Sequence, residues 1–269
     1  MPYLILGCGY TGQRVAAHLL ERGERVLATT RQPKSLTHLP NLQILPLDLP
    51  GGTLPPLPHD TRVLHSIPAL NIHGNLTDPT PELIPQLRSA RRIVYLSTTG
   101  VYGSATDVNE HTPPNATTPR ELVRLQAETA IVDSGIPYCI LRPAAIYGPD
   151  RGIHIAMLEG TATLTGDGSS YTSRIHVDDL AAITLAALDS DIQGAWPVAD
   201  ELPSTQREIA EFCAALFHLP MPASVDPQSA PPTRRANRRV DGSAIRRLLQ
   251  IQLRYPTYRE GLRAAKMRS

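Results

Sequence analysis

The segment Gly7-Cys8-Gly9-Tyr10-Thr11-Gly12 has the residue types and the spacing of a phosphate-binding turn. It lies between an aliphatic run that predicts a strand, Tyr3–Leu6, and an amphipathic stretch that predicts a helix, Thr11–Glu21. In such a turn the first glycine permits a tight bend, the second lets the backbone approach a pyrophosphate, and the third allows the helix to pack closely on the strand. The helix N-terminus offers unpaired N–H groups to the anion. We therefore expect this turn to bind a dinucleotide through Gly7, Gly9, Tyr10, Thr11 and Gly12.

The residue after the second predicted strand, Arg25–Thr30, selects between nicotinamide dinucleotides. An acidic residue there would accept a hydrogen bond from the adenine ribose 2′-hydroxyl, whereas an arginine would bind a 2′-phosphate. Arg31 follows the strand, with Lys34 close behind and no acidic residue in reach. We expect NADP, with NAD as the alternative if Arg31 only stacks on the adenine or faces solvent. Asp48 is a candidate acceptor for the adenine amino group, although a turn-capping role explains it nearly as well.

Alternation of aliphatic runs and amphipathic stretches predicts the elements around these residues, in the pattern of βαβ units. The predicted strands are Tyr3–Leu6, Arg25–Thr30, Gln43–Leu45, Arg62–Ser66, Arg92–Ser97 and Tyr138–Arg142. The predicted helices are Thr11–Glu21, Glu82–Ser89, Arg120–Asp133, Val177–Ala187 and Gln206–Leu216. Residues 49–60 carry four prolines, so the crossover there is expected to lack a helix. The fold class is α/β, a Rossmann-type doubly wound parallel sheet with a small C-terminal substrate lobe.

The chain length of 269 residues suits one large domain with a small lobe. We expect residues 1–152 to form the NAD(P)-binding domain and 153–269 the lobe, with about 174–200 returning to the sheet and Pro220–Pro232 irregular. No apolar run reaches membrane-span length and the N-terminus enters a strand at once, which predicts a cytoplasmic protein with no membrane partner. Cys8, Cys139 and Cys213 lie in or beside apolar runs without metal-binding spacing, so we expect buried thiols and no metal.

The C-terminal stretch is strongly basic. Residues 233–269 carry 11 Arg or Lys against Asp241 and Glu260. Such a charge could attract nucleic acid, but arginines that alternate with Ile245, Leu248 and Leu262 are better explained as the solvated faces of packed elements. We expect no nucleic-acid partner.

Several ordered segments together resemble the extended short-chain dehydrogenase/reductase superfamily, in its NAD-dependent epimerase/dehydratase group and an atypical branch that has lost the usual active-site pair. The matching segments are Gly7–Gly12, Leu96–Gly103 (LSTTGVYG), Leu141–Pro149 (LRPAAIYGP), Arg174–Ala181 (RIHVDDLA), Arg239–Asp241 (RVD) and Tyr255–Leu262 (YPTYREGL). They span nearly the whole chain. The resemblance implies further cofactor contacts at Leu49, Ser66, Ser97, Arg124, Pro143 and Ile146.

In this family a Ser or Thr orients the substrate oxygen, a Tyr transfers the proton, and a Lys four residues later lowers the pKa of that Tyr. The resemblance places the first role on Thr98, with Ser97 and Thr99 as neighbours, but the frame Arg124-Leu125-Gln126-Ala127-Glu128 puts Arg120 at the Tyr position and Arg124 at the Lys position. The composition agrees, since the only lysines are Lys34 and Lys266. An arginine does not give up its proton, so the usual relay cannot operate.

Replacement proton donors are Tyr102, Tyr147, Tyr171 and His176. Tyr102 ranks first because it follows Thr98 at the carboxyl end of a parallel strand, although a packing tyrosine is at least as good an explanation. The resemblance places Tyr147 against the cofactor, and His176 suits a cap or a backbone hydrogen bond better than catalysis. With Thr99, the residues expected at the substrate are Arg142, Tyr147, Arg174 and His176.

Four arginines have two open interpretations. If two or more of Arg120, Arg124, Arg142 and Arg174 converge, they would favour an anionic substrate. Alternatively, Arg124 pairs with Glu121 or Glu128, and Arg174 with Asp178 or Asp179.

Two functions remain at this point. One is an NADP-dependent oxidoreductase, or epimerase-like enzyme, that acts on a small polar or anionic molecule with a nonstandard acid/base group. The other is a noncatalytic NADP-binding sensor or scaffold. We expect a monomer or a homodimer, since the helices that pair relatives would be Glu82–Ser89, which is short, and Arg120–Asp133.

Overall fold

The computed structural model describes residues 1–230 and 236–267 and divides the chain into two compact units. The first comprises Met1–Gly103, Pro114–Arg142 and Ala181–Trp196; the second comprises Ser104–Pro113, Pro143–Leu180 and Pro197–Ser269. The expected boundary at residue 152 differs from this division, in which the second unit already begins to take up the chain at Ser104 and again at Pro143.

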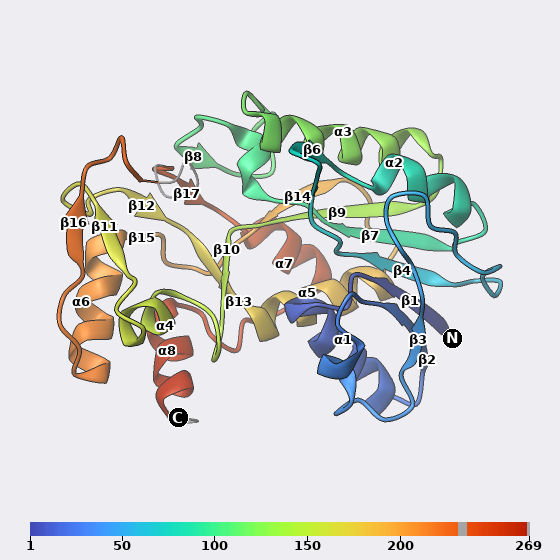
Figure 1. Ribbon diagram of the computed structural model, residues 1–269, viewed down its shortest axis with the longest axis horizontal. Coiled ribbons are helices and arrows are strands. Elements are labelled where there is room, and N and C mark those ends of the chain that lie inside the picture. The colour runs from blue at the N-terminus through green and yellow to red at the C-terminus, as the bar shows by residue number, and fades with distance from the viewer. Residues whose placement is uncertain (231–235, 268–269) are drawn as a thin grey trace. The chain divides into compact units, whose positions relative to one another are not determined.

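A seven-stranded sheet in the order β14-β9-β7-β4-β1-β2-β3 forms the centre of the first unit, and the strand pairs from β3 to β9 are all parallel. The strands are β1 (Pro2–Leu6), β2 (Arg25–Thr29), β3 (Gln43–Leu45), β4 (Arg62–His65), β7 (Arg92–Leu96), β9 (Tyr138–Pro143) and β14 (Ala195–Val198). Helices α1 (Tyr10–Glu21) and α5 (Val177–Asp189) cover one face, and α2 (Thr80–Leu83) and α3 (Pro119–Asp133) the other (Figure 1). This confirms the predicted Rossmann-type doubly wound sheet.

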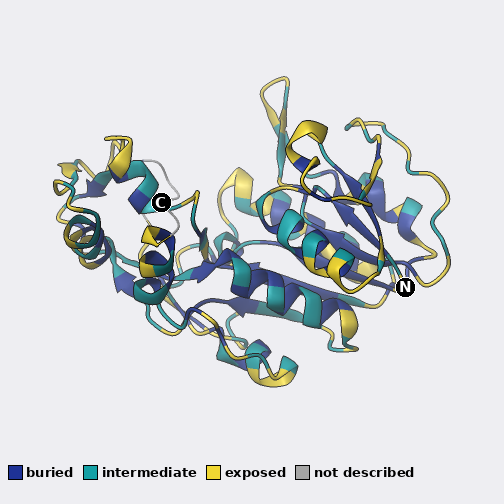
Figure 2. Cartoon of the chain, turned by 90° about the horizontal axis from the view of Figure 1, so that it is seen from below, coloured by how far each residue is buried: buried dark blue, intermediate teal, exposed yellow. Residues whose placement is uncertain are grey.

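The central strands β1, β4 and β7 are buried along nearly their whole length because both faces of the sheet are covered (Figure 2). Leu4, Val63, Ile93 and Ile140, from four adjacent strands, join one hydrophobic cluster with Ile131 of α3. The strand order reverses between β1 and β4, and in open parallel sheets ligands bind at such a switch point, beyond the carboxyl ends of the strands.

The chain between β4 and β7 differs from the prediction. A hairpin, β5 (Leu70–Ile72) with β6 (Asn75–Thr77), was not predicted, and the expected helix Glu82–Ser89 is instead the single turn α2 followed by the 3₁₀ turn Ile84–Leu87. Pro85 explains the break, since it lacks an N–H to continue the ladder and its ring crowds the preceding turn. Residues 46–61 contain no helix, as expected from their prolines. Two further 3₁₀ turns are Pro33–Leu36 and Thr99–Tyr102.

In its described residues, the second unit combines four helices with pairs of short strands. The helices are α4 (Ile153–Leu158), α6 (Gln206–Phe217), α7 (Ser243–Leu249) and α8 (Tyr258–Lys266). The strand pairs are β10 (Ala145–Tyr147) with β13 (Arg174–His176), β11 (Thr163–Thr165) with β16 (Ala223–Val225), β12 (Tyr171–Thr172) with β15 (Ser204–Thr205), and β8 (Asp107–Val108) with β17 (Arg239–Val240).

Two expectations for the second unit are tested by these elements. The segment Pro220–Pro232 is not wholly irregular, because it contains β16; its residues 231 and 232 lie outside the described part. The basic stretch forms packed elements as expected, with Ile245 of α7 and Leu262 of α8 buried.

The three cysteines are buried thiols, again as expected. None of the helices in the described ranges is long and apolar enough to cross a bilayer.

Candidate functional site

The glycine turn lies at the switch point, and each of its glycines has a distinct environment. Gly7 has φ +81°, and a Cβ there would lie 2.9 Å from Cγ1 of Ile67, so only glycine fits without a shift. A Cβ on Gly12 would lie 3.1 Å from both the Gly7 carbonyl oxygen and Cγ2 of Ile5, which is the close helix–strand approach that the motif predicts. At Gly9, by contrast, the nearest atom to such a Cβ is 4.0 Å away. The turn therefore leaves open space at its second glycine.

Hydrogen bonds hold this turn in place. The Ser66 hydroxyl donates to the Gly7 carbonyl oxygen at 2.7 Å, and the Gly7 N–H donates to the Thr29 hydroxyl at 3.0 Å. Ser66, expected at the cofactor, thus supports the turn from the end of β4. Helix α1 starts at Gly9 without a side-chain cap, whereas α3 begins with a complete capping box at Thr118. The N–H groups at the start of α1 are therefore not covered by a local side chain.

The residues expected around the adenine end lie in the first unit. Arg31 directly follows β2, its side chain is exposed, and no carboxylate in the described ranges lies within ion-pair distance of it. Asp48 is exposed, and Leu49 packs against the main hydrophobic cluster. Thr11 is buried at the start of α1. These positions are compatible with the expected contacts, which stay predictions.

Tyr102, the first-ranked replacement proton donor, is enclosed by protein. It is 1% exposed, and its hydroxyl accepts a hydrogen bond from Nη1 of Arg142 at 3.2 Å. The hydroxyl of Thr98 accepts from the Gly100 N–H at 3.1 Å and so caps the turn that carries Thr99 and Tyr102. This geometry favours the packing alternative for Tyr102, and its role as a proton donor stays a prediction.

Arg124, at the position of the family's lysine, forms an ion pair that neither alternative anticipated. Its Nη1 lies 2.7 Å from the Asp78 carboxylate, not at Glu121 or Glu128, and both side chains are almost fully buried. The same guanidinium donates to the carbonyl oxygens of Ile67, beyond β4, and of Leu96, at the end of β7. Arg124 therefore joins the ends of two strands beside the switch point.

Asp78 is a residue that the sequence analysis missed. Besides Arg124, it accepts hydrogen bonds from the Tyr95 hydroxyl at 3.1 Å and from the Thr80 N–H at 3.0 Å. His65 lies beside this network, bonded to the Thr80 hydroxyl at 2.8 Å, and burial lowers its pKa to about 4. The motif Asp78-Pro79-Thr80 resembles an ordinary helix start in the sequence, which hides its role as a buried counterion.

Arg142, expected at the substrate, has an internal carboxylate partner, and its substrate contact stays a prediction. Its Nε and Nη2 bind the Glu128 carboxylate, with the shortest distance 2.6 Å, and both side chains are less than 10% exposed. Ser97, expected at the cofactor, donates its hydroxyl to the same carboxylate. The three arginines of the first unit therefore do not form a shared anion site: Arg120 is exposed, and Arg124 and Arg142 each have an internal carboxylate.

The remaining expected residues belong to the second unit, so their contacts with a cofactor bound in the first stay predictions. Pro143 is buried and Ile146 is half-buried. The Tyr147 hydroxyl donates to the Thr257 carbonyl oxygen at 3.3 Å, and burial raises its pKa well above the usual range. His176 packs edge-on to the Tyr147 ring, and its Nδ1 accepts from the Asp178 N–H at 3.2 Å. This bond agrees with the structural role expected for His176.

Arg174 pairs with neither Asp178 nor Asp179, which corrects the other proposed pairing. Both carboxylate oxygens of Asp179 accept from the backbone N–H groups of Arg254 and Tyr255, at 2.7 and 3.0 Å, and so anchor the C-terminal segment. Arg174 has one hydrogen bond, a long one of 3.4 Å to the Thr172 carbonyl oxygen, and no ion pair within the described ranges.

Asp200 is a second buried carboxyl that the sequence did not reveal. It is 2% exposed, its Oδ2 has no hydrogen-bond partner among the described residues, and burial raises its pKa to about 7. Between pH 4 and 7 the folded protein therefore keeps a proton that the unfolded chain has lost. Stability conferred by this group falls as the pH rises through that window.

We expect Asp200→Asn to remove this pH dependence. As the pH rises from 5 to 7.5, the free energy of unfolding of the parent protein should fall relative to that of the variant. Urea denaturation at several pH values across this range measures both free energies. Asp107→Asn, at an exposed position, is the matched control and should leave the slope unchanged. Parallel curves for the parent and Asp200→Asn would show that Asp200 titrates normally.

Comparisons with known proteins agree with this fold. Residues 68–198 match the model of the NAD dependent epimerase/dehydratase family. A structure of a conserved Silicibacter pomeroyi protein of unknown function is 29% identical, with a TM-score of 0.84 and coverage of 100% of this chain and 99% of that one. UDP-glucuronic acid 4-epimerase from Bacillus cereus, solved with UDP-glucuronic acid and NAD, is 21% identical, with a TM-score of 0.82 and full coverage of both chains.

One curated protein matches over a shorter stretch. The 3-diazoavenalumate denitrifying reductase of a Streptomyces species is 29% identical over 125 residues, which is 44% of this chain and 40% of the reductase. The chain thus aligns with less than half of that relative's length. Taken with the sheet order and the glycine turn, these matches agree with the resemblance drawn from the sequence: residues 68–198 match the NAD dependent epimerase/dehydratase family, and the chain has the fold of the solved epimerase.

Proposed function

We propose that this protein binds a nicotinamide dinucleotide, with preference for NADP, and acts as an atypical oxidoreductase on a small polar or anionic molecule. The observation that carries the proposal is the glycine turn at the switch point, whose second glycine is open and whose following helix has no side-chain cap. The Bacillus cereus epimerase was solved with NAD, and the Streptomyces relative is a reductase, which support the cofactor and the reaction class.

The residues of this chain would divide the work in a particular way. The N–H groups at the start of α1 would bind the pyrophosphate, and Arg31 the 2′-phosphate. When bound, the nicotinamide supplies or accepts a hydride. Arg124 would hold the strand ends on either side of the cofactor through the Ile67 and Leu96 carbonyl oxygens, and Asp78 keeps its charge compensated. Thr98, Thr99 and Ser97 lie at the end of β7, where a substrate oxygen would be oriented.

A second function, a noncatalytic NADP-binding sensor or scaffold, is favoured by the state of the acid/base groups. Tyr102 is buried against Arg142, and Arg124 is paired with Asp78. The two functions differ in turnover. NADPH oxidation should be followed at 340 nm with a panel of keto acids, sugar nucleotides and aromatic acids. Turnover that falls on Thr98→Val supports the enzyme, whereas tight NADPH binding with no turnover on any of them supports the sensor.

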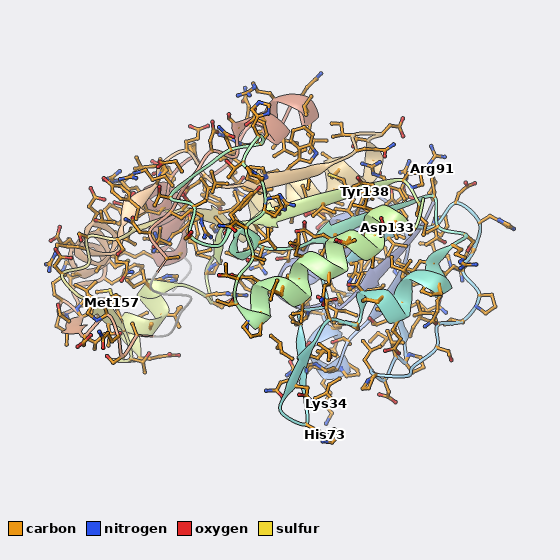
Figure 3. The ribbon with its side chains drawn as sticks, turned by 90° about the horizontal axis from the view of Figure 1, so that it is seen from above. Lys34, His73, Arg91, Asp133, Tyr138 and Met157 are labelled. Atoms are coloured by element: carbon orange, nitrogen blue, oxygen red, sulfur yellow. The ribbon has the colours of Figure 1, made fainter. Side chains whose placement is uncertain are left out.

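The preference for NADP predicts the effect of reversing the charge at Arg31. A charge-assisted hydrogen bond to phosphate contributes about 1.5–3 kcal/mol, so Arg31→Asp should shift the ratio of NADPH to NADH affinity at least about 10-fold toward NADH. Affinities would be measured by isothermal titration calorimetry. Arg91→Asp is the matched control, since Arg91 is exposed and lies apart from Lys34 in the same unit (Figure 3). An unchanged ratio in Arg31→Asp would refute the role of this arginine.

A further inference from the structure

We propose that Asp78 is a positioning residue for the dinucleotide, which acts through Arg124 on the segment that supports the glycine turn. The inference rests on the proposed function in taking this turn as the cofactor site. It assigns a role to a carboxylate that is itself buried, with a side chain 2% exposed. All of the residues involved belong to the first unit.

One guanidinium holds both ends of an excursion of the chain. Beyond β4 the chain passes Ile67, forms the hairpin β5–β6, and returns at Asp78. Nη1 of Arg124 donates to the Ile67 carbonyl oxygen at 3.1 Å and to the Asp78 carboxylate at 2.7 Å. Nη2 donates to the carbonyl oxygen of Leu96, the last residue of β7. The hairpin itself contacts α3, the helix that carries Arg124, through β6 (Figure 1).

Ile67 is also the residue that packs on the first glycine of the turn. A Cβ on Gly7 would lie 2.9 Å from Cγ1 of Ile67, and 3.0 and 3.1 Å from its N and Cα. The preceding residue, Ser66, donates its hydroxyl to the Gly7 carbonyl oxygen at 2.7 Å. A displacement of Ile67 would therefore disturb both contacts that support the turn from β4. The contacts that lead from Asp78 through Arg124 to Ile67 thus continue to the turn without a break.

Asp78 decides where this guanidinium lies, because the Arg124 side chain is only 8% exposed. A guanidinium kept out of water without its carboxylate is costly, so loss of the negative charge would favour movement of Arg124 away from its carbonyl partners. The carboxylate is held in turn by the Tyr95 hydroxyl at 3.1 Å and the Thr80 N–H at 3.0 Å. Since burial raises the pKa of Tyr95, its hydroxyl stays protonated and donates to Asp78.

The same unit contains a second Tyr–Asp–Arg triad, which offers an internal control. Asp189 accepts from the Tyr3 hydroxyl at 2.7 Å and from Nη1 of Arg62 at 2.6 Å. Tyr3 and Arg62 lie at the starts of β1 and β4, whereas Tyr95 lies near the end of β7. Ligands of open parallel sheets bind beyond the carboxyl ends of the strands. The two triads therefore share their chemistry and lie at opposite edges of the sheet, so their comparison separates a positioning role from a contribution to stability.

NADPH titrations of the folded variants test the positioning role. Asp78→Asn keeps the size of the side chain and removes its charge. It should weaken NADPH binding about 10-fold, within the usual range of coupling between separate sites. Asp189→Asn should lower the thermal midpoint and leave the NADPH affinity unchanged. Unchanged affinity in Asp78→Asn, or an equal loss in both variants, would overturn the proposal.

A milder pair of variants decides the question if Asp78→Asn does not fold. Tyr95→Phe removes a single hydrogen bond to the Asp78 carboxylate, and Tyr3→Phe removes its counterpart at Asp189; both tyrosines are at most 1% exposed. Tyr95→Phe should weaken NADPH binding about 3-fold, the equivalent of one hydrogen bond, whereas Tyr3→Phe should not. Equal affinities in this pair would contradict the role of Asp78.

Hydrogen exchange without nucleotide distinguishes failure of this inference from failure of the proposed function. The Cys8 N–H, which donates to the Thr29 carbonyl oxygen at 2.7 Å, reports opening of the turn. Measured relative to the amides of β4, its exchange should be faster in Asp78→Asn, or in Tyr95→Phe, and unchanged in Asp189→Asn. No such difference would refute the inference whatever the parent protein binds. If the difference occurs and the parent does not bind NADPH, the proposed function fails and the support of the turn by Asp78 stands.

Discussion

Gly9→Asp is expected to abolish binding of the nicotinamide dinucleotide while leaving the fold intact. The backbone at Gly9 has φ −94°, which any residue adopts, and a Cβ there would meet no atom closer than 4.0 Å. The new carboxylate would therefore fit the protein but lie beside the negatively charged pyrophosphate. Loss of the close backbone approach together with like-charge repulsion should weaken NADPH binding on the order of 100-fold or more, about 3 kcal/mol.

This variant has a matched control and a clear contradiction. Gly9→Asn has nearly the same size without the charge, so the difference between the two variants isolates the electrostatic part. The thermal midpoints of both should stay close to that of the parent protein. Gly7→Ala and Gly12→Ala would be poor substitutes, because their added atoms clash within the protein itself. If Gly9→Asp binds NADPH as tightly as the parent, the cofactor site is not at this turn.

The largest loss of stability is expected from Glu128→Ala. The Glu128 and Arg142 side chains are 4% and 8% exposed, and Glu128 also accepts the Ser97 hydrogen bond. Removing the carboxylate leaves a buried guanidinium without its counterion, which typically costs about 3–5 kcal/mol. Urea denaturation should show this drop in unfolding free energy.

Two companion variants test the explanation. Glu211→Ala, at the exposed Arg207–Glu211 pair, should cost less than about 1 kcal/mol. The double variant Glu128→Ala with Arg142→Met should recover much of the loss, because the unpaired charge is removed as well. A single variant as stable as the parent would show that Arg142 finds another partner or is solvated.

Local patterns in the sequence determined the fold class and the candidate cofactor site. The spacing of Gly7, Gly9 and Gly12 between a strand and a helix depends only on neighbouring residues, and the structure shows the expected tight bend and close packing. The six sheet strands predicted from apolar runs all occur, with ends that differ by a residue at most. The expected helix Glu82–Ser89 is also broken by a local feature, Pro85, which has no N–H to continue the helix.

The partners of the charged residues were decided by the tertiary structure. Helical spacing offered Arg124 two glutamates, but the sheet brings Asp78, 46 residues earlier in the chain, to 2.7 Å from its guanidinium. The position of Tyr102 after a strand made it the first candidate for a proton donor. That position does not reveal the hydrogen bond to its hydroxyl from Arg142, which lies 40 residues away in the chain. Local spacing limits a side chain to neighbours within about one helical turn, whereas a parallel sheet brings together the ends of strands that are far apart in the sequence. The turn could therefore be identified from the sequence alone, while the charges that surround it could be assigned only after the strands had been placed.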